Sequence, residues 1–150
     1  MKISCSMDIN SDPASVFGWL ENPEKAVKWM TSVTKTEILH TTPEKTGTTF
    51  REVVEEDGNG VELQGVITDY KPEKSISFHL NNRVNVVDVE YCVEANQHGI
   101  RLTQNANVRW KFPINVISIF MGAKIRQNIS EQSKKEFKKL KELCEGSFEQ

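Results

Sequence analysis

The sequence contains few of the residues that mark disulfide-rich or zinc-binding proteins. Only three of its 150 residues are cysteines, Cys5, Cys92 and Cys144, and no two of them form a closely spaced pair. An odd, scattered set of this kind predicts neither a disulfide framework nor a zinc site. Reduced thiols in a reducing compartment are the simplest interpretation.

The chain also lacks a long hydrophobic run. Its longest apolar stretch, residues 114–125, is interrupted by polar and small residues and falls short of the roughly 20 residues that span a bilayer. Residues 1–5 do not resemble a signal peptide. We therefore expect a soluble, cytoplasmic protein without membrane insertion.

No excess of positive charge is present. The net charge is -2 and the isoelectric point is near 6.0, which argues against a nucleic-acid partner. The three histidines, His40, His79 and His98, share no ligand-like spacing with cysteines or carboxylates. We expect no metal and no cofactor.

The composition and length suit one globular unit. Hydrophobic residues make up 37% of the chain and charged residues 27%, values typical of a folded domain. A chain of this length can bury a sizeable core. We predict a single domain over residues 1–150.

Alternating apolar and polar residues, bounded by turn residues, predict seven strands. Their ranges are 3–9, 33–41, 47–56, 61–71, 75–81, 85–96 and 100–110. Between the first two, Ser11 or Asp12 can cap a short helix that begins at Pro13, and Asn22 precedes a second helix. Short turns join the later strands, which predicts an antiparallel meander.

After Pro113 the apolar period becomes helical. An apolar stripe runs along one face of a long helix: Ile114, Ile117, Met121, Ile125, Ile129, Phe137, Leu140 and Cys144. Gly122 is the expected position of a bend. Lysines interleaved with Glu131, Glu136 and Glu142 predict a solvated opposite face.

These elements together predict an α+β helix-grip fold. A seven-stranded, curved antiparallel sheet, with two short helices after its first strand, would hold the long C-terminal helix in its concave face. Curvature would leave space between sheet and helix near the short helices.

Several local patterns resemble the START/polyketide-cyclase (SRPBCC) superfamily, which includes the birch-pollen allergen fold. They are the opening segment 9–20 with Asn22-Pro23-Glu24 and Trp29, the segment Gly47-Thr48-Thr49-Phe50, and Tyr70-Lys71-Pro72 leading into 76–78. The resemblance covers nearly the whole chain and specifies a fold rather than a reaction. It implies a hydrophobic cavity, which members use for lipids, sterols, polyketides and other apolar molecules.

The resemblance favours binding or carriage of a small hydrophobic ligand such as a lipid, polyketide or aromatic metabolite. A cyclase- or dehydratase-like enzyme is the first alternative, with Glu52, Tyr91 or Gln104 as the reacting groups. A protein-binding module is the second, because a related branch activates a heat-shock chaperone. We expect a monomer or a weak homodimer.

Inward-facing strand positions and the helix stripe give ten candidates for the cavity wall: Trp29, Phe50, Leu63, Phe78, Tyr91, Gln104, Trp110, Ile117, Met121 and Ile125. Gln104 is the favoured polar group, whereas Glu52 is interpreted as facing water because Val53 leaves its register ambiguous. The apolar segment 110–121 allows three interpretations: deep burial, a cavity mouth or a dimer surface.

Overall fold

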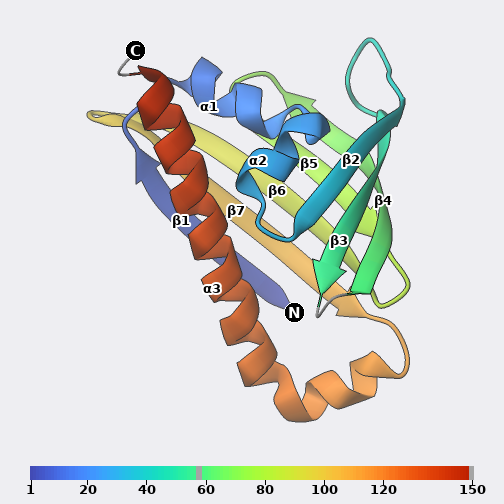
Figure 1. The fold of residues 1–150 in the computed structure, drawn as a ribbon. Coiled ribbons are helices and arrows are strands. Elements are labelled where there is room, and N and C mark those ends of the chain that lie inside the picture. The colour runs from blue at the N-terminus through green and yellow to red at the C-terminus, as the bar shows by residue number, and fades with distance from the viewer. Residues whose placement is uncertain (57–58, 149–150) are drawn as a thin grey trace.

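A computed structural model describes residues 1–56 and 59–148, with side chains described for all of these except 56, 59, 117–120 and 147–148. Within these residues, one face of a seven-stranded antiparallel sheet carries the helices (Figure 1). The elements are β1 (Lys2–Ile9), α1 (Pro13–Leu20), the 3-10 helix η1 (Pro23–Lys25), α2 (Ala26–Trp29), β2 (Val33–His40), β3 (Thr49–Glu56), β4 (Asn59–Lys71), β5 (Ser75–Asn81), β6 (Asn85–Asn96), β7 (Gly99–Trp110) and α3 (Ile114–Phe148).

The strand order confirms the predicted helix-grip class. The sheet runs β1-β7-β6-β5-β4-β3-β2, so six consecutive strands form a meander and β1 pairs with the last of them. β1 and β7 are antiparallel, with Ile9 opposite Ile100 and Met7 opposite Leu102. The first strand and the last strand therefore lie side by side at one edge.

The two short helical segments begin as the sequence predicts. Of the two possible caps of α1, the structure uses Asp12, whose carboxylate accepts a hydrogen bond from the Ser15 backbone N–H at 2.8 Å. The Asn22 carboxamide oxygen caps η1 by accepting from the Glu24 N–H at 3.0 Å. Helices α1 and α2 lie over the middle strands of the sheet (Figure 1).

Side chains from the inner face of the sheet, the short helices and α3 form one core. Its largest members include Phe17, Trp29, Phe50, Phe78, Tyr91, Phe137 and Leu140. The aromatic rings meet edge to face, with centroids 5.8 Å apart for Phe50 and Phe78 and 6.1 Å apart for Trp29 and Tyr91. Such pairs prefer this geometry because the ring edge is positive and the face negative.

Helix α3 packs on the sheet along its C-terminal part. Phe137, Leu140 and Cys144 are fully buried, whereas Met121 is 45% exposed. The apolar stripe is therefore fully buried only from about residue 133 onward, and its earlier members Ile125 and Ile129 are half-buried. The reason is length: 35 residues of helix span about 50 Å, whereas a 12-residue strand spans about 40 Å and the sheet ends first.

The first turns of α3 lie beyond the end of the sheet (Figure 1). Phe112 is 80% exposed and Val116 is also exposed, so deep burial is wrong for the described part of segment 110–121. The helix bends at Met121, whose φ of -119° and ψ of 17° are not helical, next to the predicted Gly122. Within the described residues, no helix combines the length and the apolar character needed to cross a membrane.

Candidate functional site

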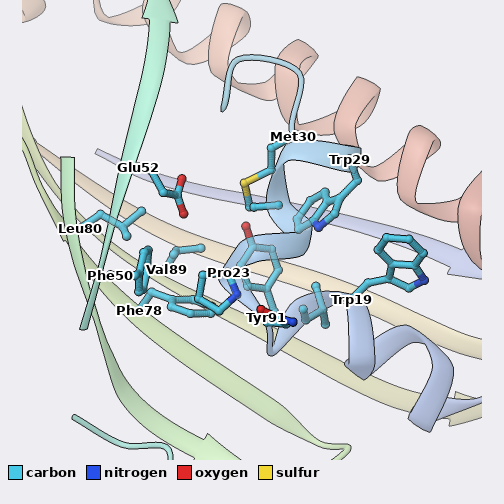
Figure 2. A pocket seen from close by; sticks show the side chains of 13 residues that line it. Trp19, Pro23, Trp29, Met30, Phe50, Glu52, Phe78, Leu80, Val89 and Tyr91 are labelled. Atoms are coloured by element: carbon cyan, nitrogen blue, oxygen red, sulfur yellow. The ribbon is translucent and has the colours of Figure 1, made fainter. Parts of the chain in front are cut away.

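A small cavity lies between the short helices and the central strands. Its volume is about 50 Å³, and Figure 2 shows the side chains around it. The lining residues are Trp19, Leu20, Asn22, Pro23, Ala26, Trp29, Met30, Phe50, Glu52, Phe78, Leu80, Val89 and Tyr91. The wall is mostly apolar and aromatic, as in many ligand sites.

A glycine in β4 shapes the floor of the cavity. Gly65 pairs with Phe50 of β3, and the Phe50 ring lies directly against its backbone. A Cβ atom at residue 65 would stand 2.3 Å from the ring, a distance that atoms do not tolerate. The missing side chain therefore lets Phe50 lie close to β4 beside Phe78.

The rim of the cavity is less tightly held than its floor. Trp19, Asn22, Met30 and Leu80 are only half-buried. Lys25 and Lys28 lie over the outer face of the Trp19 ring, with their Nζ atoms 5.3 and 5.9 Å from its centroid. Met30 is flexible and fills irregular space, so this rim is the part of the wall that can move.

Glu52 faces the cavity rather than water. Its side chain shares the phase of Phe50 and is only 7% exposed, so the water-facing interpretation is wrong. The carboxyl extends from β3 into the space framed by the labelled side chains in Figure 2. Burial, together with the nearby charge of Glu136, raises the pKa of Glu52 from 4.5 to about 7.

A second carboxyl, missed by sequence reasoning, comes from α3. Glu136 is half-buried, and its Oε2 accepts a hydrogen bond from the Thr31 backbone N–H at 3.0 Å. Burial raises the pKa of Glu136 to about 7. Its spacing was a usable signal, because Glu136 lies three residues after Ser133 and four before Leu140, both buried.

Tyr91 forms a hydrogen bond with Gln104 and lies within the electrostatic influence of Glu52 and Glu136. Gln104 donates through Nε2 to the Tyr91 hydroxyl at 3.4 Å. Burial, followed by the charges of Glu136 and Glu52, raises the pKa of Tyr91 well above its ordinary value. The Trp29 indole N–H is buried and has no hydrogen-bond partner among the described residues.

The structure brings four of the ten predicted wall residues together around the cavity: Trp29, Phe50, Phe78 and Tyr91. Five others lie outside its lining. Leu63 is buried in β4, Gln104, Trp110 and Ile125 are half-buried, and Met121 is exposed. The side chain of Ile117 lies outside the described residues. The role of each in ligand binding stays a prediction.

In the described part of the chain, no three histidine, cysteine, aspartate or glutamate side chains are grouped so that they could hold a metal ion. Glu52 and Tyr91 place a carboxyl and a hydroxyl in the apolar wall of the cavity, and the charge of Glu136 on α3 acts on both. Groups of this kind can orient a ligand or exchange protons with it.

Three solved structures illustrate the fold. A protein from Thermus thermophilus is 14% identical, with a TM-score of 0.82 and coverage of 98% of this chain and 99% of that one. A START superfamily protein from Mycobacterium smegmatis is 14% identical, with a TM-score of 0.81 and 97% coverage of both chains. The di-domain ARO/CYC protein StfQ from the steffimycin biosynthetic pathway is 12% identical, with a TM-score of 0.82; this chain is 99% covered and matches 52% of StfQ.

At such low identity these likenesses describe the fold alone. No curated protein matches the chain by sequence. A family model described as polyketide cyclase / dehydrase and lipid transport matches residues 1–145, which confirms the resemblance found in the sequence. The chain belongs to the polyketide cyclase/dehydrase and lipid transport family.

Proposed function

We propose that the protein binds a small hydrophobic molecule in the cavity between its short helices and its sheet. The observation that carries this proposal is an aromatic, mostly apolar cavity with polar groups placed at its edge. The Trp29 indole N–H is buried without a hydrogen-bond partner in the described chain, and the Glu52 carboxyl lines the same cavity, so a ligand could bond to both. Family membership supports a ligand of lipid or polyketide type.

The volume of the cavity sets a condition on this function. About 50 Å³ accommodates a few water molecules, whereas ligand sites usually span about 300–1,000 Å³. Binding must therefore displace part of the wall. The half-buried Met30 and Trp19 at the rim are the side chains that we expect to move.

Filling the cavity tests the proposal. Ala26 is 4% exposed and lines the cavity, so Ala26→Leu should occupy the space that a ligand needs. Ala123→Leu, on the exposed surface of α3, is the matched control. NMR titration with indole, naphthol and decanol should shift amide resonances around the cavity in the parent and the control, with affinity reduced by about tenfold or more in Ala26→Leu. If none of the probes perturbs these residues, ligand carriage is wrong.

A second candidate function is acid–base catalysis of the cyclase or dehydratase type. The specific observation in its favour is Glu52, whose pKa of about 7 suits a group that both accepts and returns protons near neutral pH. Tyr91, in the same wall, could donate a hydrogen bond to an enolate oxygen.

Proton exchange at carbon would reveal this activity without knowledge of the substrate. Indanone incubated in deuterium oxide should lose its α-proton NMR signal faster with the protein than without it. In this mechanism Glu52 removes the α-proton and a deuteron from solvent replaces it, so Glu52→Gln should abolish the acceleration. Equal exchange rates with the parent protein and with Glu52→Gln would exclude Glu52 as the base.

A further inference from the structure

Glu52 is a largely buried residue whose carboxyl lines the cavity without a hydrogen-bond or ion-pair partner among the described residues. It is 7% exposed, and among the described residues no side chain or backbone group donates a hydrogen bond to it. Holding a carboxylate in a poorly solvated space is costly unless a hydrogen bond or an opposite charge compensates it. A hydrophobic residue at this position would avoid that cost, so the empty cavity alone does not account for Glu52.

A second negative group faces the same region from another element. Glu136 of α3 lies close enough to raise the pKa of Glu52, and both carboxyls act in the same way on Tyr91 of β6. The Thr31 N–H satisfies one oxygen of Glu136 and holds its carboxyl toward the loop after α2.

Among the residues that the structure describes, no positive group balances these acids. Within the described residues, neither Glu52 nor Glu136 takes part in an ion pair with lysine, arginine or histidine. The lysines over the rim residue Trp19 are Lys25, which is half-buried, and Lys28, which is exposed. Glu52 therefore has no positive partner of its own in the part of the chain that the structure describes.

We propose that the ligand of this cavity carries a protonated amine, with Glu52 as its counter-ion and an apolar or aromatic body against Phe78 and Tyr91. This inference rests on the proposed ligand-binding function and names the chemical class of the ligand. An ammonium group supplies the donors that Glu52 lacks and reduces its repulsion from Glu136. Aromatic rings such as Trp29 and Tyr91 also attract a cation.

The same charges select against other ligands. A fatty acid or another carboxylate would add a third negative group to Glu52 and Glu136 in a poorly solvated space. A neutral alcohol could donate one hydrogen bond to Glu52 but would leave the charge unbalanced. The expected order of affinity is amine, then alcohol, then carboxylate.

Amine binding should also depend on pH. The titratable groups that face Glu52 are Glu136 from α3 and Tyr91 from β6, while its strand neighbours are Thr36 of β2 and Leu63 of β4. An ammonium ligand needs Glu52 ionised, and its pKa in the empty protein is about 7. Below that pH the ligand must displace a proton, so affinity should fall by up to about tenfold per pH unit.

Three probes of similar shape test this charge assignment: phenethylamine, phenethyl alcohol and hydrocinnamic acid. NMR titration of the full chain at about pH 8 should show phenethylamine binding about tenfold or more tightly than the alcohol, and no binding of the acid. Glu52→Gln should remove the preference for the amine, so that its affinities for the amine and the alcohol agree within about twofold. Glu55→Gln, an exposed position of the same strand, should change neither.

The outcomes separate this inference from the proposed function. Binding of the alcohol or the acid as tightly as the amine would overturn the charge assignment and leave ligand binding intact. Failure of all three probes to bind would overturn both. If Glu52→Gln does not fold, the parent protein still decides the matter, because amine affinity must weaken between about pH 8 and pH 6 while alcohol affinity does not.

Discussion

At the scale of single residues, Gly65 of β4 leaves no room for a side chain. The Phe50 ring occupies the place of a Cβ atom, and Phe50 itself is packed against Phe78. We expect Gly65→Ala to lower the free energy of unfolding by about 1–3 kcal/mol, as overpacking usually does, and to push the ring into the cavity. Urea denaturation measures the change.

Gly18 offers the matched control in helix α1. A Cβ atom there meets no heavy atom within 4 Å. Gly18→Ala should raise the free energy of unfolding by about 0.5–1 kcal/mol, because alanine loses less backbone freedom in a helix. Equal effects of the two alanine substitutions would contradict the contact between Gly65 and Phe50.

The Glu52 carboxyl should make stability depend on pH. Its pKa is about 7 in the folded protein and near 4.5 when unfolded, so the folded state holds a proton that the unfolded chain releases. The resulting stability is fully present below about pH 4.5 and is lost as the pH rises through 7, by up to about 1 kcal/mol per pH unit.

Glu52→Gln removes this titration, whereas that of Glu136 remains. Unfolding measured in urea between about pH 4.5 and 8 should therefore show a smaller decline for Glu52→Gln than for the parent, with little difference at the acidic end. Glu55→Gln should follow the parent curve. Parallel curves for Glu52→Gln and the parent would mean that Glu52 is not buried as described.

At the scale of secondary structure elements, α3 is held by its C-terminal part. Leu140 is fully buried, whereas Met121 in the same helix is exposed. Leu140→Ala should cost about 2–5 kcal/mol of unfolding free energy, and Met121→Ala less than about 1 kcal/mol. Thermal or urea denaturation compares them. A large effect at Met121 would indicate that the first turns of α3 have a packing partner.

The strands were the most predictable elements, and the contacts of α3 the least. Alternation along β5 and β6 and the turns between strands gave ranges that match the structure closely. An apolar stripe shows which face of a helix is apolar but not where its packing partner ends, so Met121 and Ile125 were grouped with Phe137. The Glu52 register was ambiguous because Val53 and Val54 both follow it.

The cavity itself was only partly predictable. Inward alternation identified Phe50, Phe78 and Tyr91, but the rim residue Met30 depends on how α2 meets the sheet. That relation is tertiary, and local spacing does not contain it. The partial burial of Glu136 was not predicted, because the lysines around it in the sequence are typical of a solvated helix face.

At the scale of the whole molecule, the core joins elements from both ends of the chain. Ile9 of β1, Leu20 of α1 and Leu140 of α3 belong to one buried cluster. The single domain predicted over residues 1–150 should therefore unfold in one cooperative step. Tryptophan fluorescence and far-ultraviolet circular dichroism should give coincident transitions in urea. Separate midpoints would divide the chain into independently stable parts.

The pairing of β1 with β7 has a consequence for synthesis on the ribosome. Lys2 aligns with Asn107, so about 100 further residues must be synthesised before the partner strand β7 leaves the ribosome. At about 5–20 residues per second, that interval lasts roughly 5–20 s. During this time the apolar side chains of the strand, Ile3 and Ile9 among them, have no sheet to join, and the nascent chain is a natural client for chaperones that shield short hydrophobic segments.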